Sequence, residues 1–475
     1  MIIGGIIMKS VLIGNGVNIQ FGGKAYTSEF ILQRIKYKAK QDKYSDLFEK
    51  SISGNEIVDL LNGFVDICND ILKGQYDDLI EKTDDLVALQ DFKKRYEKWT
   101  VTESKDIMLE DWFFLIHMFF LKNPDLSDNE TGAIQAFERL CLDSIYNEGD
   151  VEQIYKLTNK KYKRFLNSFD NLFTVNYDNN IEKITGREVF HLHGDFSVLN
   201  DSENPNIVSG FLRTEKKQTV AIPGYEHCFC NALLNYSGYL KYKRAQSNHE
   251  LNLVSQTYTE NIKTNPDFYA PILETHPEMY EIIMTKIKHP ELQMATEYYF
   301  DKLATIKSEI HIIGLSPNND SHIFNIINKN NEIHTVYFYY FSPEEKKQAE
   351  TVFKTKNLIC IQVINFWKTL DCSQKKYNCN YKFDYSAINL VEICKLFSGY
   401  GIVTKETLQK EINTIPLFEM HRLTKVVKDA MINQGRPGSE KQLQRFMDEI
   451  SFIGLREGVS PPVLYLIAII NFSKI

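Results

Sequence analysis

The stretch VLIGNGVN at residues 11–18 passes directly from strand-forming residues into two closely spaced glycines. Two further stretches have the same form, FTVNYD at 173–178 and FHLHGD at 190–195. An apolar or β-branched run that ends abruptly in Gly, Asn, Asp or His is typical of the carboxyl end of a parallel strand. Because open α/β sheets bind their ligands at these ends, we expect the functional site at these three loops.

The chain after residue 308 alternates strands with helices. Strands are expected at 310–313, 335–341 and 359–363, and helices at 323–327 and 343–353. Together with strands expected at 171–175 and 188–192, this rhythm predicts an α/β fold, a Rossmann-like doubly wound parallel sheet.

Large helical insertions are expected between these strands, at about residues 28–168 and 226–308. The clearest helices are at 56–71 and 109–121, and the second is apolar almost all round, which indicates burial. At 475 residues the chain exceeds the size at which one core keeps growing. We predict a domain at 1–380 that contains the sheet and both insertions, and a small helical module at 381–475 for assembly or sensing.

The composition limits the class of protein. The formal charge of −7 argues against a surface devoted to nucleic acid. The basic aromatic stretch at 155–165 is the best candidate for such contacts, but a run of this kind is usually a solvated helix face. Eight cysteines without paired spacing, and no signal peptide, indicate reduced thiols in a cytoplasmic protein. No apolar run is long enough for a membrane span. Whether Met1 or Met8 is the natural start stays open.

Each loop has a functional and a structural interpretation. In the functional interpretation, Gly14 and Gly16 let the backbone approach a pyrophosphate, and the amides of a helix that starts near Val17 or Asn18 act as donors. In the structural interpretation, the two glycines make a tight strand-to-helix turn. Strand alternation would put Thr174, Asn176 and Asp178 on one side while the strand lasts. In the functional interpretation these side chains hold a water or a ribose hydroxyl. In the structural interpretation they form an Asx turn before a helix at 180–183.

The third loop contains two histidines. His191 and His193 flank one residue, so in a strand they would face the same way. Three interpretations are open: His193 is catalytic, the two histidines bind a metal together, or both are structural. No third metal ligand stands at a recognisable spacing, so no metal is expected.

The ordered set of motifs resembles the sirtuin family. Its Gly-Ala-Gly-x-Ser, Thr-x-Asn-x-Asp and His-Gly motifs match the loop at 14–18, Thr174 to Asp178, and His193 with Gly194. Gly314 and Ser316 stand where that family has Gly-Thr-Ser. The chain also departs from the family in three ways. Asn15 and Asn18 replace the motif alanine and serine, and no Gly-Ile-Pro-x-Phe-Arg segment is found. Cys228 and Cys230 lack the second cysteine pair that a four-cysteine zinc module requires.

The long helical insertions resemble those of divergent sirtuin-like effectors of bacterial anti-phage defence, and the motifs are also similar to the abortive-infection H family. This resemblance implies an NAD+ glycohydrolase with NAD+ as its substrate. The pyrophosphate would lie at Gly14, Asn15, Gly16, Val17 and Asn18, and the adenosine ribose near Gly314 and Ser316.

The resemblance also implies roles for the remaining loop residues. Asn176 would position water or the 2'-hydroxyl, and His193 would act as a base. Thr174 and Asp178 would line the ribose end or orient the loop.

Two other functions remain open at this point, a protein deacylase and a nucleotide sensor without turnover. The deacylase would require the missing zinc module. Because constant NAD+ loss would harm the cell, the defence interpretation implies restraint. We therefore expect a homo-oligomer and a phage-derived trigger or a partner subunit such as an ATPase.

Overall fold

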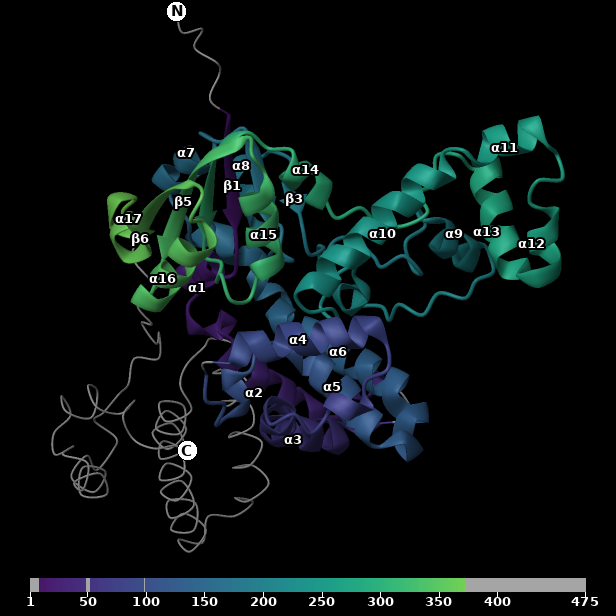
Figure 1. The fold of residues 1–475 in the computed structure, drawn as a ribbon, viewed down its shortest axis with the longest axis horizontal. Coiled ribbons are helices and arrows are strands. Elements are labelled where there is room, and N and C mark those ends of the chain that lie inside the picture. The colour runs from purple at the N-terminus through teal and green to yellow at the C-terminus, as the bar shows by residue number, and fades with distance from the viewer. Residues whose placement is uncertain (1–7, 48–51, 98, 373–475) are drawn as a thin grey trace, which may run out of the picture. The chain divides into compact units, whose positions relative to one another are not determined.

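A computed structural model describes residues 8–47, 52–97 and 99–372 of the chain (Figure 1). Its six strands form one all-parallel sheet in the order β3-β2-β1-β4-β5-β6. The strands are β1 Lys9–Ile13, β2 Asn171–Thr174, β3 Phe190–His191, β4 Ser308–Ile313, β5 Ile333–Tyr340 and β6 Asn357–Gln362. The strand order reverses direction between β1 and β4, which is the topological switch point of a Rossmann-like sheet.

The α-helices fall into three sets along the chain. The first set is α1 Gly16–Gly22, α2 Ser28–Ala39, α3 Gly54–Leu72, α4 Thr83–Tyr96, α5 Asp111–Lys122, α6 Glu130–Tyr146, α7 Lys160–Leu166 and α8 Asn180–Thr185. The second set is α9 Val208–Glu215, α10 Tyr239–Ser255, α11 Tyr258–Thr264, α12 Ala270–Thr275, α13 Pro277–Lys288 and α14 Phe300–Ala304. The last set is α15 Ser321–Lys329, α16 Pro343–Val352 and α17 Val363–Thr369, and a short 3₁₀ helix, η7 Glu226–Phe229, lies between α9 and α10.

Helices cover both faces of the sheet. On one face, residues of α14, α15 and α16 share a buried cluster with Leu12, Phe173, Ile312 and Phe338 of the strands. On the other face, aromatic rings of α1, α7 and α17 contact one another and the β4 and β5 residues His311 and Tyr339. This two-sided cover confirms the predicted doubly wound α/β fold.

The predicted elements correspond closely to those observed. The strand expected at 188–192 is shorter, because β3 pairs with β2 only at Phe190 and His191. The helices expected at 56–71 and 109–121 are α3 and α5, and the second is buried nearly all round. The described chain divides into two compact units, with residues 22–37 outside the unit that contains the sheet. The module predicted at 381–475 lies outside the described residues.

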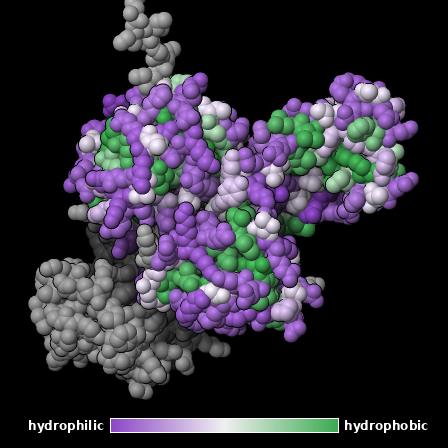
Figure 2. All heavy atoms as spheres, viewed as in Figure 1, coloured by the Kyte–Doolittle hydropathy of each residue, from purple (hydrophilic) through white to green (hydrophobic). Residues whose placement is uncertain are grey.

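The second helical insertion exposes apolar side chains. Figure 2 shows hydrophobic residues at the surface over the α10–α13 segment. Five side chains there are about half exposed: Leu253, Val254, Phe268, Leu273 and Met279. No described helix has both the length and the apolar composition that a bilayer span requires. Exposed apolar residues that are close together often mark protein contacts.

Candidate functional site

Three glycines meet at the switch point of the sheet. The amide of Gly14 donates to the carbonyl of Ile313 at 2.9 Å, and the amide of Gly16 donates to the carbonyl of Gly314 at 3.0 Å. Gly314 has a φ of +75°, and a Cβ added there would lie 2.9 Å from the carbonyl oxygen of Gly14. The loops after β1 and β4 are therefore in direct backbone contact, and glycine is required because a side chain would separate them.

This packing changes the interpretation of the first motif. Helix α1 begins at Gly16, and the amide of Val17 donates to the carbonyl of Gly14 at 3.0 Å. The amides of Gly16 and Val17 are thus already hydrogen-bonded within the protein. The tight strand-to-helix turn, one of the two interpretations of this motif, is the one that the contacts support, while the loop still lies where open sheets bind ligands.

Replacement of Gly14 by Ala is expected to destabilise the fold. The new Cβ would lie 2.6 Å from the carbonyl oxygen of Gly314, a backbone atom that cannot move aside without shifting β4. We expect the free energy of unfolding to fall by about 1–3 kcal/mol, as for other overpacked sites. Urea denaturation measures it, with Gly63→Ala as the control, because a Cβ at Gly63 in α3 meets nothing within 4 Å. Equal stability of the two variants would contradict the close loop contact.

Asp178 ties the first two loops together. Its Oδ2 accepts from Asn18 Nδ2 at 2.6 Å, and its Oδ1 accepts from the backbone amide of Asn180 at 3.1 Å. Burial raises the pKa of Asp178, and the hydrogen bonds from Asn18 and Asn180 oppose this rise. Both carboxylate oxygens are therefore engaged inside the protein, so Asp178 and Asn18 orient the loops. The Asx-turn interpretation holds for Asp178.

Thr174 also acts within the protein. Its hydroxyl donates to the carbonyl of Ile13 at 3.1 Å and accepts from the amide of Asn176 at 3.0 Å. Strand β2 ends at Thr174, so the alternation expected for Thr174, Asn176 and Asp178 does not continue past that residue. The predicted alternation therefore ends at Thr174 and does not fix the sides on which Asn176 and Asp178 lie.

Asn176 differs from its neighbours. Its backbone is fixed by Thr174 and by His191, whose Nδ1 lies 3.0 Å from the Asn176 carbonyl oxygen. The residue is 7% exposed, yet its side-chain amide makes no hydrogen bond to any described residue. Its amide atoms are not among the fully buried side-chain atoms that lack a partner, so this carboxamide keeps some access to a ligand or to water.

His191 is a charged structural residue. Its Nδ1 faces the Asn176 carbonyl, and its Nε2 lies 2.7 Å from Glu182 Oε1 on α8. Both partners only accept hydrogen bonds, so both ring nitrogens must donate, which requires the imidazolium form. Burial disfavours the charge, but Glu182 and Asp195 outweigh it and raise the pKa of His191 to about 9.

This pKa predicts a pH dependence of stability. The unfolded-state pKa of histidine is about 6.5, so the contribution of His191 is complete below pH 6.5 and is lost as the pH rises through about 9. We expect the midpoint of thermal unfolding to fall over that interval, and to fall less in His191→Gln. His334→Gln, at an exposed position of β5, should behave like the parent chain. A His191→Gln profile equal to that of the parent would contradict the charged state.

His193 faces a different element from His191. Its Nε2 lies 3.2 Å from Nε2 of His322 on α15, and its ring also contacts Phe300 of α14. Because β3 ends at His191, the expectation that the two histidines face the same way is wrong, and they do not form a metal pair. Burial first, and then Lys241 and His322, lower the pKa of His193 well below the usual value, so the ring is neutral.

Gly194 sets the course of the chain after His193. Its φ is +98°, and an added Cβ would lie 2.5 Å from the carbonyl oxygen of Asn231. The amide of Leu233 donates to the carbonyl of His193 at 2.8 Å. Glycine is thus required here for a close backbone approach that holds His193.

Charged side chains from the insertions accompany His193, and the sequence motifs did not reveal them. Lys241 of α10 is 2% exposed, and its Nζ lies 3.2 Å from Oε1 of Glu110. Burial, and then the charge of Lys241, lower the pKa of both His193 and His322. Burial, and then the charge of Glu110, raise the pKa of Asp320 to about 7. A group of ionisable residues therefore lies beyond the strand ends, next to the neutral histidines.

The loop after β4 contains the remaining predicted residues. Ser316 Oγ accepts from the amide of Asn318 at 3.4 Å, and the Ser316 carbonyl accepts from the amide of Asp320 at 3.1 Å. The amide nitrogen Nδ2 of Asn318 is buried without a hydrogen-bond partner among the described residues. The loop that starts at Gly314 thus contributes both to the switch point and, through its end at α15, to the surroundings of His193.

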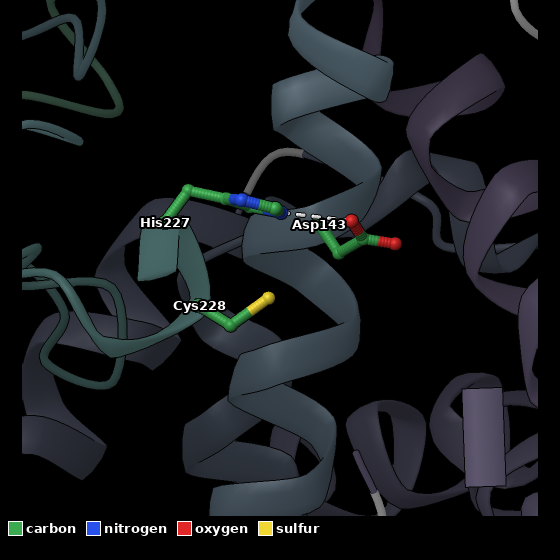
Figure 3. A group of neighbouring side chains, drawn as sticks. All are labelled: Asp143, His227 and Cys228. Atoms are coloured by element: carbon green, nitrogen blue, oxygen red, sulfur yellow. Dashed lines mark hydrogen bonds and ion pairs between the residues drawn. The ribbon is translucent and has the colours of Figure 1, made fainter. Parts of the chain in front are cut away.

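A second group, at a distance in sequence from the strand-end motifs, has metal-ligand types. Figure 3 shows Asp143 of α6 facing His227 and Cys228 of η7, and their ligand atoms lie within 4.8 Å of one another. His227 Nε2 is 2.8 Å from Asp143 Oδ1, while the buried Lys38 ammonium pairs with the other carboxylate oxygen. Burial and Asp143 raise the pKa of the Cys228 thiol. The Lys38 ammonium and His227 already engage both carboxylate oxygens of Asp143, so we interpret this group as a buried ion network.

No protein-family model, curated protein or solved structure matches this chain.

Proposed function

We propose that this chain is a sirtuin-like NAD+ glycohydrolase that cleaves NAD+ to nicotinamide and ADP-ribose and so depletes NAD+ in abortive-infection defence against phage. One observation carries the proposal. Asn176 and His193 each lie two residues beyond the paired residues Thr174 and His191 of neighbouring strands. One side chain has no hydrogen-bond partner among the described residues, and the other is neutral and buried.

The location of these two residues supports a dinucleotide as the ligand. Strand β1 separates β2 from the switch point, where Gly14 and Gly314 touch. Open sheets of this order bind dinucleotides across that crevice. The adenosine side would lie toward the loop of Gly314 and Ser316, and the nicotinamide ribose toward Asn176 and His193.

The chemistry required is modest. Breaking the N-glycosidic bond generates positive charge on the ribose, and water must then add to it. The carboxamide of Asn176 would hold that water or a ribose hydroxyl, and neutral His193 would accept the proton. Asp178 and Thr174, whose polar atoms bond to the protein, would act by fixing the loop. Asn18 would do the same through Asp178.

Product analysis tests the proposal. The purified full chain is incubated with NAD+, with and without phage lysate, and the products are separated by chromatography. Equal amounts of nicotinamide and ADP-ribose are expected. NAD+ consumption that depends on an added acetylated peptide would indicate a deacylase instead. Saturable NAD+ binding with no product under any condition would indicate a sensor and contradict the hydrolase.

Restraint of this activity belongs to the same proposal. A homo-oligomer, a phage-derived trigger or a partner subunit such as an ATPase would switch the enzyme on. The exposed apolar residues of the α10–α13 segment support a contact surface of this kind. Activity that rises more steeply than protein concentration would support assembly as the switch.

A further inference from the structure

His193 and His322 form a buried histidine pair. Their Nε2 atoms are 3.2 Å apart, and the rings are nearly parallel, at 20°. His193 is 2% exposed and His322 is 4% exposed. His193 lies in the loop after β3 and His322 lies in α15, 129 positions away in sequence.

The contact allows only one proton between the two Nε2 atoms. One nitrogen must donate and the other must accept, because two N–H groups would repel and two bare nitrogens would leave both unsatisfied. Nδ1 of His322 is buried without a hydrogen-bond partner among the described residues. An unpaired buried N–H is rarer in proteins than an unpaired acceptor. The favoured tautomer therefore leaves Nδ1 of His322 bare and puts its proton on Nε2.

Positive charges around the pair oppose a further proton. Burial is the largest cause of the lowered pKa of both histidines, Lys241 of α10 adds to it for both, and Arg95 of α4 adds to it for His322. Two carboxyl groups lie nearby. Glu110 bonds to Lys241, and Asp320 directly precedes α15. Burial, and then the charge of Glu110, raise the pKa of Asp320 and so disfavour its ionised form. The pair thus lies in a setting that holds both rings neutral.

We infer that His322 is a positioning residue for His193: its Nε2–H donates to Nε2 of His193 and so keeps that nitrogen unprotonated, the state that a base requires. The role of His193 as a base rests on the proposed function. In the resting state His322 takes the place of the hydroxyl or water that a substrate would bring. An incoming hydroxyl or water displaces the His322 N–H from this nitrogen before it gives up its proton, so His322 fixes the ring and the tautomer of His193 until the substrate is bound.

Three variants of His322 test this inference in the full chain. His322→Ala removes the donor and admits water, so the pKa of His193 should rise toward its usual value. The acid limb of the kcat–pH profile should therefore move to higher pH, and kcat at the plateau should fall about 10-fold or more with little change in KM. His322→Gln can place an amide near the former Nε2 position and should restore much of kcat. His322→Asn is too short and should not.

A spectroscopic measurement makes the test independent of NAD+ turnover. Histidine-labelled full chain is studied by 15N NMR, and the two residues are assigned by the loss of their signals in His193→Ala and His322→Ala. In the parent chain we expect a bare Nε2 and a protonated Nδ1 on His193, with no titration near pH 6.5. His322→Ala should abolish this tautomer preference.

The two proposals can fail separately. If the parent chain shows the predicted tautomer but never cleaves NAD+, the proposed function fails and the pair stands. If NAD+ is cleaved but the acid limb and the His193 signals are unchanged in His322→Ala, the positioning role of His322 is wrong.

Discussion

Replacing Asn176 by Ala in the full chain is expected to lower the rate of NAD+ loss on the order of 100-fold or more. The side-chain amide of Asn176 makes no hydrogen bond to another described residue, so its expected role is toward the substrate. For the same reason the fold should tolerate the change. The backbone of Asn176 is held through its own amide and carbonyl, which an alanine retains.

The kinetic pattern distinguishes chemistry from binding. If Asn176 holds the reacting water or a ribose hydroxyl, kcat should fall much more than KM rises. Initial rates of NAD+ loss measure both constants. Asn167→Ala, at an exposed position after α7, is the matched control and should keep full activity. An Asn176→Ala enzyme that is folded and fully active would remove Asn176 from the mechanism.

Replacing Arg95 by Met is expected to have the largest effect on stability, a loss of about 3–5 kcal/mol in the free energy of unfolding. Arg95 lies on α4 and bridges two carboxylates. Its Nη2 and Nε bond to Asp111 at 2.5 and 3.2 Å, and its Nη1 pairs with Asp91. Asp111 is 1% exposed and has Tyr96 as its other partner, at 2.9 Å. Without Arg95, a buried carboxylate would lose its counter-charge.

A double variant separates the ion pair from simple packing. Replacing Arg95 by Met and Asp111 by Leu together removes both charges, and we expect much of the lost stability to return. Lys94→Met, on the exposed side of α4, is the control and should change stability little. Urea unfolding followed by circular dichroism gives the free energies. A double variant no more stable than Arg95→Met would show that the ion pair is not the cause.

The strands and their loops could be predicted because their signals are local. A buried parallel strand is a short apolar run, and a glycine or polar residue marks its end, as at Ile13 and Gly14. The loops were therefore expected at one edge of the sheet, and the parallel pairing of the strands confirms this. The exact strand ends could not be predicted. β2 and β3 end at Thr174 and His191, so alternation did not fix the direction of Asp178 and gave the wrong one for His193.

The charged surroundings of His193 could not be predicted from any motif. Lys241 lies in α10, Glu110 directly precedes α5, and His322 lies in α15. Only tertiary packing brings these three residues near His193. The signal for His322 was weak, a histidine directly before the helix expected at 323–327. Gly238, just before α10, packs so closely against Asp91 that an added Cβ would meet that side chain. A close approach of this kind places Lys241 of α10, but it leaves no pattern in a single sequence.

Proton acceptance by His193 is the step on which the proposed hydrolysis depends, and one comparison tests it. NAD+ loss by the purified full chain is measured beside His193→Ala, over a range of protein concentrations and with phage lysate added. His334→Ala, which removes an exposed histidine, is the control. We predict nicotinamide and ADP-ribose from the parent chain and the control, and at least 100-fold less from His193→Ala. Equal NAD+ loss by a folded His193→Ala variant would contradict the proposed mechanism.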